Sequence, residues 1–227
     1  MTRTPLKSLS RVLFSLLILG FAGLGLGVAA SAQAVSRGAP PCGQPEGIDD
    51  DSYDGTLDPI ACCDFQVSNA SPIRLDVKVN VAVSHTQVGD LTIKLESPAG
   101  TLVTLMSRPG LLEAADDGTE CCGFESDWDG SLVRFADAAQ VSAEAMGVAG
   151  LAVCSEDDVC DYASAPGSAE GLGLADFEGE DPNGTWLCCV GDGAPGDVGT
   201  LDDCALDLSI FIDGFETGDT DNWSATS

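Results

Sequence analysis

The chain has 227 residues, of which 37 are Asp or Glu and 9 are Lys or Arg, so its formal net charge is −28 at pH 7. Beyond residue 33 the balance is six basic against 37 acidic residues, or 6 − 37 = −31, with the single histidine neutral. A surface this negative repels nucleic acid and anionic lipid, which argues against both as partners. Solubility outside the cell and cation binding by acidic loops are the two roles that this charge allows.

Residues 1–32 are predicted to be a secretory signal peptide. Arg3, Lys7 and Arg11 precede an apolar run that ends in the small-residue cleavage site Ala30-Ser31-Ala32. A transmembrane anchor is the alternative, because the run is just long enough to span a bilayer. Its glycines and the cleavage site favour removal, so we expect a secreted, extracellular protein without membrane contact after cleavage.

Residues 33–56 are polar, acidic and rich in proline and glycine, which is typical of a linker that leads into a domain. A short strand is predicted over Ala61–Val67. The clearest pattern follows in Arg74–Met106, where apolar residues alternate with polar ones in two successive runs. Pro98 and Gly100 mark a type I turn between the second run and a third β-rich segment. This pattern predicts a three-strand antiparallel unit.

A long acidic loop is expected between Ser107 and Leu132. A loop of this length in a compact domain usually carries function or is held in place, and its two cysteines favour the second role. Calcium needs six to eight oxygen ligands, and carboxylates in such loops supply them. The candidate calcium ligands, here and near the glycine-rich turn before residue 200, are Asp116, Asp117, Asp127, Asp129, Asp192 and Asp197. Solvated acidic loops that bind no ion are the alternative.

The rest of the chain predicts further short strands. Leu132–Phe135 is β-like, whereas Ala138–Val153 is predicted to hold a helical turn or two, its glycines opposing a long helix. Strands are then expected over Trp186–Val190 and Leu201–Ile212. Many short strands with turn signals between them indicate an all-β sandwich.

The ten cysteines all follow the predicted signal peptide, and an even number in an oxidising compartment predicts up to five disulfides. Tetrahedral zinc is the weaker alternative, because only one histidine is present and four thiolates would be required. Adjacent cysteines in a strand point to opposite faces, so the members of each Cys-Cys pair are expected to have different partners. Cys154 and Cys160 close a small loop and are predicted to pair with each other.

Catalysis is not expected. His85, the only histidine, continues the inward parity of its strand and is predicted to be hydrogen-bonded at a turn rather than to act as a triad base. No G-x-S-x-G motif is present. Carboxylate pairs for glycoside hydrolysis are uninformative among so many acids.

Residues 81–101 resemble the signature of the P domain, or P/Homo B domain, of the proprotein convertase and kexin-like subtilisin family. His85-Thr86, Gly89-Asp90-Leu91 and the Ser97–Thr101 turn carry the likeness, and it continues in Phe177–Trp186 and Gly196–Leu201. The resemblance covers roughly residues 57–212. It implies a disulfide-rich jelly-roll β-sandwich that is found beside subtilisin-like serine protease domains and helps to stabilise them, here standing alone without the protease domain.

Two departures from the family pattern suggest a disulfide. Cys188 stands where the family usually has leucine, and Cys204 where it usually has tryptophan, so the resemblance implies a Cys188–Cys204 bond in place of that core contact. Residues 213–227 form an acidic tail that resembles the ending of many exported proteins of Gram-negative bacteria. That likeness widens the expected location to the periplasm or cell surface of such a bacterium.

The expected function is that of a secreted, non-catalytic binding or stabilising module, whose partner is a subtilisin-like protease or another extracellular protein. One alternative is an accessory part of a proteolysis system that counts as a serine endopeptidase through its domain association alone. A β-sandwich adhesin or glycan-binding module is the other.

Overall fold

The structure is a computed structural model that describes residues 39–68, 70, 77–165, 167, 171 and 173–208. The predicted signal peptide, the start of the strand pattern at Arg74, the end of the last predicted strand and the acidic tail lie outside the described residues. Among the residues that are described, no helix has the length and hydropathy needed to cross a membrane.

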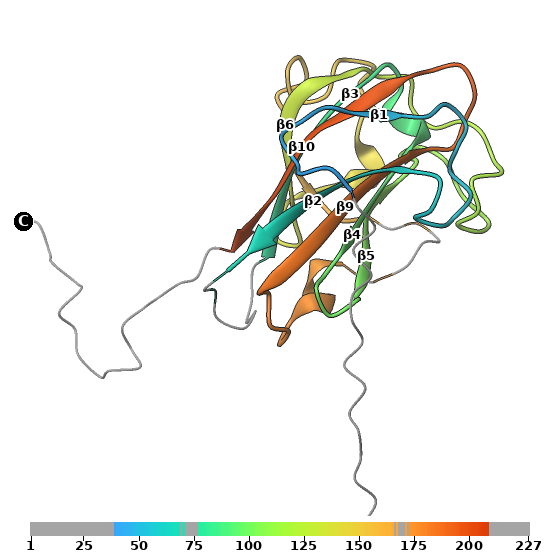
Figure 1. Ribbon diagram of the computed structural model, residues 1–227. Helices are drawn as coiled ribbons and strands as arrows, with labels where there is room; N and C mark the ends of the chain where they lie inside the picture. The colour runs from blue at the N-terminus through green and yellow to red at the C-terminus, as the bar shows by residue number, and fades with distance from the viewer. Residues whose placement is uncertain are drawn as a thin grey trace, which may run out of the picture. The chain divides into compact units, whose positions relative to one another are not determined.

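Ten strands in the described part of the chain form two sheets around a common core (Figure 1). The six-stranded sheet has the order β1 (Glu46–Ile48), β10 (Gly199–Leu208), β3 (Val77–His85), β6 (Trp128–Ala136), β8 (Asp161–Ala163) and β7 (Val141–Ser142). The four-stranded sheet has the order β2 (Ala61–Val67), β9 (Gly184–Asp192), β4 (Leu91–Glu96) and β5 (Leu102–Ser107). All neighbours are antiparallel except β6 with β8 and β7 with β8. The predicted all-β sandwich is confirmed, and its arrangement is compatible with a jelly roll.

The core lies between the two sheets because alternate side chains of each strand point inward. Val79, Val81 and Val83 of β3 are fully buried, as are Ile93 of β4 and Trp186 of β9. The Trp186 indole donates to the carbonyl of Pro182 over 2.9 Å and meets the ring of Phe177 edge-on, with 5.0 Å between ring centroids. Phe177 belongs to a 3-10 turn, η3 (Leu174–Phe177), that covers this part of the core.

The predicted three-strand unit is wrong in its pairing. β4 and β5 form the expected hairpin, closed by a hydrogen bond from the Gly100 amide to the Ser97 carbonyl over 2.9 Å. β3 instead lies in the other sheet, because the five residues after His85 contain a 3-10 turn, η1 (Val88–Asp90), that carries the chain across the sandwich. Alternation in the sequence predicts which face is buried, but it does not identify the neighbouring strand.

Two predicted boundaries also differ from the structure. The expected acidic loop ends earlier, because Trp128 and Asp129 already pair with β3 as the first residues of β6. The expected linker over residues 33–56 contributes to the sandwich from its middle on: β1 pairs with β10, and Ile48 and Tyr53 are each 4% exposed. The β-sandwich therefore begins before residue 57. The helical turn expected in Ala138–Val153 is the 3-10 turn η2 (Ala143–Ala145).

Five disulfides join the ten cysteines. The strand pairs Cys62-Cys63 and Cys188-Cys189 lie in β2 and β9, and the members of each pair have different partners, as alternation along a strand requires. Three of the five disulfides involve these strand pairs and a fourth closes the small loop at residues 154–160. In chain order these four are Cys42–Cys63, Cys62–Cys189, Cys154–Cys160 and Cys188–Cys204. The last two confirm pairs predicted from the sequence, and Cys188–Cys204 ties β9 to β10 of the opposite sheet.

Cys121 and Cys122 are joined to each other. Different partners were expected for them, and this prediction is wrong because it rests on the alternation of side chains in a strand. Both residues lie in the loop between β5 and β6, residues 108–127, where no strand separates their side chains.

Candidate functional site

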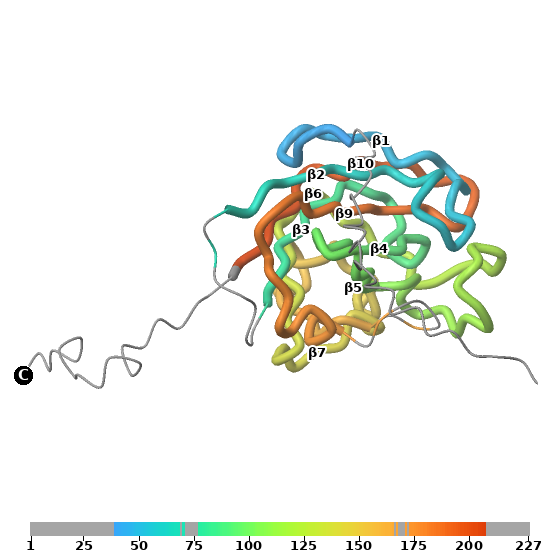
Figure 2. The backbone as a smooth tube through the Cα atoms, turned by 60° about the horizontal axis from the view of Figure 1, so that its bottom comes forward, coloured from blue at the N-terminus to red at the C-terminus, as the bar shows by residue number. Residues whose placement is uncertain are grey.

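Charged side chains are buried at one end of the sandwich, where η1, the loop 108–127 and the end of β9 meet. The amide of Gly89 donates to the carbonyl of Phe124 over 3.1 Å, and the amide of Gly193 donates to that of Asp90 over 2.9 Å. The loop, drawn in light green, projects beyond the strand ends in Figure 2. We call the buried ionisable residues at this junction the buried charge network; they are His85, Asp90, Lys94, Arg108, Glu113 and Asp192.

His85 ends β3 and connects the two sheets. Its Nε2 lies 3.2 Å from Oδ2 of Asp192, which ends β9 in the other sheet. Its Nδ1 lies 2.9 Å from the carbonyl oxygen of Gln87 and 3.1 Å from the Gln87 amide nitrogen. In the described part of the chain neither ring nitrogen contacts a hydroxyl or thiol, so the geometry is that of a structural histidine at a turn.

The network shifts two pKa values upward. Burial acts to lower the pKa of His85, but the hydrogen bond and charge of Asp192, helped by Gln87 and Asp90, outweigh it and raise that pKa. Burial is also the main cause that raises the pKa of Asp90 to about 6, followed by the charges of Asp192 and Asp197. The side-chain amide of Gln87 donates to the Asp90 carboxylate over 2.9 Å. Both shifts favour a proton on the folded protein.

Lys94 anchors the loop to the four-stranded sheet. Its ammonium donates to Oδ2 of Asp116 over 2.7 Å and lies 5.5 Å from the centroid of the Tyr53 ring. The Tyr53 hydroxyl donates to the other oxygen of Asp116. Lys94 belongs to the face of β4 that alternation predicts to be solvent-exposed, yet it is 1% exposed because the loop and the segment around Tyr53 cover that face. The outer face of β4 is therefore also buried, and its contacts there are polar.

Arg108 holds the same loop at its start. Its Nε donates to Glu113 over 2.6 Å, and one terminal nitrogen donates to the carbonyl of Glu120 over 2.6 Å. Ser107 adds hydrogen bonds of 2.9 and 3.0 Å to the two oxygens of Glu113. Arg108 and Lys94 thus replace the solvent that would otherwise surround these carboxylates, and the loop is held in place by the protein's own cations.

Three of the predicted calcium ligands have other partners in the structure. Asp116 is bound by Lys94 and Tyr53, as described above. Both oxygens of Asp192 are also used, one beside His85 and the other accepting the amide of Ala194 over 2.9 Å. Asp197 accepts the hydroxyl of Thr86 over 2.5 Å.

The other three predicted ligands lie at exposed positions. Asp117 accepts the amide and hydroxyl of Thr119, which hold the pKa of Asp117 below its usual range, and Asp129 accepts the hydroxyl of Ser131. Asp127 is exposed at the end of the loop. Over residues 39–208, where described, no three His, Cys, Asp or Glu side chains gather as a metal centre would require. The six acids do not form one calcium centre, and calcium binding stays a prediction, testable by melting the protein with and without calcium.

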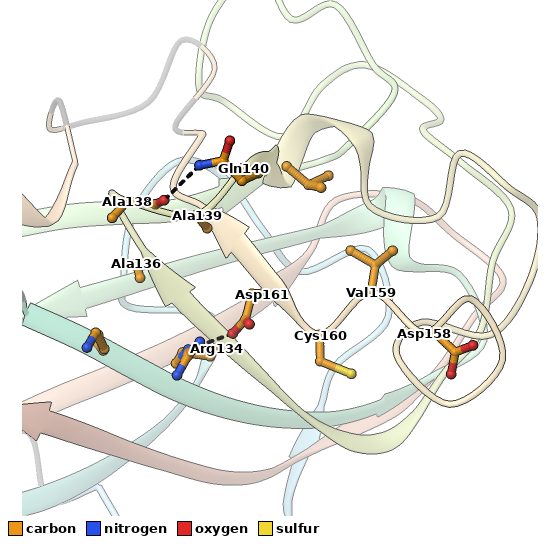
Figure 3. Close-up of a pocket in the computed structure, with 11 residues that line it drawn as sticks. Arg134, Ala136, Ala138, Ala139, Gln140, Asp158, Val159, Cys160 and Asp161 are labelled. Carbon is orange, nitrogen blue, oxygen red and sulfur yellow. Dashed lines mark hydrogen bonds and ion pairs between the residues drawn. The ribbon is translucent and has the colours of Figure 1, made fainter.

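A pocket of about 450 Å³ opens on the six-stranded sheet, away from the buried charge network (Figure 3). Lys78 of β3 and Arg134 of β6 reach it, and the connection from Ala138 to Val141 and residues 158–161 complete its walls. Arg134 forms an ion pair with Asp161 over 2.5 Å, and both side chains are about half exposed, at 44% and 51%. The pocket therefore brings basic, acidic and apolar groups together.

Lys94, Arg108 and Tyr53 were not singled out from the sequence. The available signal was indirect: a lysine in an apolar strand and an arginine in an acidic loop become notable only in a chain with so few basic residues. Burial of Lys94 depends on which segment covers β4, and the alternating pattern carries no information about that cover.

The comparison with known families bears out the resemblance. Residues 75–131 match the family model of the proprotein convertase P-domain. This segment contains β3, η1, β4, β5, the loop 108–127 and the first residues of β6, so the buried charge network lies largely within it. No curated protein matches the sequence.

Two solved structures are similar to part of the chain. One is the serine protease of Aeromonas sobria in complex with the chaperone ORF2, with 18% identity and a TM-score of 0.36. The other is the serine protease of Aeromonas sobria, with 17% identity and a TM-score of 0.35. Each alignment covers 71% of this chain and 24% of that protein, so the present chain spans about a quarter of the length of these proteases.

Proposed function

We propose that this protein is a secreted, non-catalytic module that binds and stabilises a subtilisin-like serine protease. The observation that carries the proposal is the match of residues 75–131 to the proprotein convertase P-domain, on a chain whose described residues fold as a β-sandwich. P domains accompany protease domains, and the matched residues have structural roles here. Secretion is supported by the signal-like start of the sequence and by five disulfides, which persist in oxidising compartments.

The non-catalytic role is supported by how the reactive residue types are used. Both nitrogens of His85 are engaged by Gln87 and Asp192, and every cysteine is paired. A serine protease needs a histidine beside its nucleophile. A serine-directed fluorophosphonate probe should therefore leave the purified chain unlabelled, and labelling of a serine in this chain would overturn the non-catalytic assignment.

The loop 108–127 is the surface that we assign to the protease. It lies within the segment that matches the family, and buried ion pairs fix its shape before any partner arrives, which lowers the entropy cost of binding. Leu112 projects from it with 95% of its surface exposed. An exposed leucine on a rigid, acidic loop fits a partner with an apolar pocket and a basic rim.

The direct test is capture of the partner. The tagged chain, incubated with culture supernatant of the producing cell, should retain a protein that the fluorophosphonate probe labels and that mass spectrometry identifies as a subtilisin-like protease. Adding the chain to that protease should also raise its melting temperature. Retention of glycans alone, shown on a glycan array, would favour the adhesin alternative and overturn the proposal.

A matched pair of variants tests the surface. Leu112→Ser should weaken capture of the protease without changing the melting temperature of the free chain. Val198→Ser is the control, because Val198 is also well exposed, at 66%, but lies in the turn between β9 and β10, outside the matched residues. Equal capture by both variants would show that the loop 108–127 is not the contact surface.

A further inference from the structure

We propose that the Cys121–Cys122 disulfide is a surface site for thiol–disulfide exchange, at which small thiols or a partner thiol act while the rest of the fold stays intact. This pair differs from the other four in its exposure. Cys121 and Cys122 are both exposed, whereas no other cysteine of the chain is. Cys63, Cys188 and Cys189 are at most 1% exposed.

Access of the attacking thiol controls the rate of exchange. A thiolate must approach a disulfide sulfur from the side opposite the bond that breaks, so burial protects a disulfide. Each of the three bonds that involve β2, β9 and β10 has at least one buried cysteine, so the sandwich shields it on that side. The Cys154–Cys160 bond is partly covered, which makes it the nearest competitor and the natural internal comparison.

The loop around the exposed pair is anchored on both sides without the help of the disulfide. Before it, the carbonyl of Glu120 accepts Arg108 over 2.6 Å. After it, the amide of Gly123 donates to Gly89 over 3.2 Å, and the amide of Phe124 donates to Pro109 over 2.8 Å. The disulfide itself closes a ring across one peptide bond and therefore restricts the unfolded chain very little. Opening the bond should leave the fold and the loop anchors in place.

The chemistry requires only a thiol as the second reactant. A thiolate attacks one of the two sulfurs, forms a mixed disulfide with it, and breaks the Cys121–Cys122 bond, so that the other cysteine leaves as a thiolate. A second thiolate then attacks the mixed disulfide and releases the oxidised reagent together with the reduced pair. The reverse sequence, driven by a small disulfide, restores the Cys121–Cys122 bond.

The surroundings select among thiols by charge. Glu120 and Glu125 flank the pair, and the chain carries a formal net charge of −28. Cationic thiols should therefore concentrate at the site and anionic thiols should be repelled, an effect that salt screens. The class of reagent to which this site responds is a neutral or cationic thiol.

The test is graded reduction of the folded protein, followed by alkylation and peptide mapping. Untreated protein should yield no alkylated cysteine. Increasing concentrations of cysteamine should first reduce the Cys121–Cys122 bond, so that the alkylating agent places two labels per chain on Cys121 and Cys122. The other eight cysteines should stay unlabelled, and the melting temperature should stay unchanged. Each thiol's rate is divided by its rate toward a neutral model disulfide under the same conditions. On this scale cysteamine, which is cationic, should react roughly threefold faster at low salt than at high salt. The anionic mercaptoethanesulfonate should react more slowly at low salt than at high salt.

Matched variants separate exchange at this site from general reduction. Cys121→Ser/Cys122→Ser should lose the early labels and keep its melting temperature, whereas Cys154→Ser/Cys160→Ser should keep the early labels. Alkylation of Cys121 and Cys122 in untreated protein would show that the bond is absent and overturn the proposal. First labelling at any other cysteine, or covalent dimers that the first variant abolishes, would also overturn it.

Discussion

Lys94→Met tests whether a buried ion pair fixes the acidic loop. The ammonium is 1% exposed and lies 2.7 Å from Asp116, whose own side chain is 10% exposed. Methionine fills much of the same volume but leaves the Asp116 carboxylate covered and facing an apolar group. The Tyr53 hydroxyl remains its neighbour and donates one hydrogen bond. The substitution therefore removes the charge and keeps most of the packing.

The expected loss follows from the burial of both partners. Removing one member of a buried pair costs about 3–5 kcal/mol, because the remaining charge is uncompensated. Asp116 keeps the Tyr53 hydrogen bond and some access to water, so we expect the lower end, about 3 kcal/mol. In a domain of this size 1 kcal/mol moves the melting temperature by about 2–4 °C, which gives a drop of about 6–12 °C.

The assay is urea unfolding of a double-mutant cycle that combines Lys94→Met with Asp116→Asn. The double variant should recover a large part of the loss, because no unpaired charge remains in it. Arg134→Met is the matched control. It removes the same kind of pair, Arg134–Asp161, at a site where the side chains are 44% and 51% exposed, and it should cost less than about 1 kcal/mol. If Lys94→Met cost no more than Arg134→Met, the loop would not depend on its buried cation.

Two further predictions concern the same junction. The raised pKa values of His85 and Asp90 mean that both groups stabilise the fold at low pH. The contribution of Asp90 is complete below pH 3.8 and is lost as the pH rises through about 6. The contribution of His85 is lost as the pH rises through its raised pKa. Asp90→Asn should therefore match the wild type near pH 4 and become more stable, by up to about 3 kcal/mol, at pH 7, measured by urea unfolding across that range; parallel curves would contradict this. Gly89→Ala should cost about 1–3 kcal/mol in the same assay, because its Cβ would lie 2.2 Å from the backbone nitrogen of Phe124. Gly47→Ala is its control, since a Cβ there meets nothing within 4 Å, and equal stability of the two variants would contradict the close approach.

The sequence predicts the elements of this fold better than their neighbours. β2 spans the expected residues, and the hairpin of β4 and β5 has the expected turn, because alternation and turn residues are local signals. The assignment of β3 to the other sheet depends on the path of η1, which no alternation encodes. β1 was missed because a strand of three residues is too short to show a period.

The candidate sites were likewise predicted well where the signal is local and poorly where it depends on the tertiary fold. Alternation along strands correctly gives different partners to the cysteines of β2 and β9. It does not apply to Cys121 and Cys122, because they lie in a loop, and they pair with each other. Six aspartates were predicted to bind calcium, and one of them, Asp116, does contact a cation, but that cation is Lys94. Arg108 pairs with Glu113, which was not a predicted ligand. Composition showed the excess of negative charge without showing that two of the few positive charges are buried.

Three of the residues that carry the family likeness, His85, Gly89 and Asp90, lie at one junction, and their roles there are structural. His85 connects β3 to β9 of the other sheet, Gly89 allows Phe124 to approach, and Asp90 accepts both Gln87 and the amide of Gly193. A chain that keeps this motif keeps the crossover between the sheets, whatever it binds. Choice of partner must then depend on exposed residues outside the motif, such as Leu112. Substitutions at His85 should consequently change stability, whereas substitutions at Leu112 should change binding. This difference would show that the motif maintains the fold and that exposed residues outside it bind the partner.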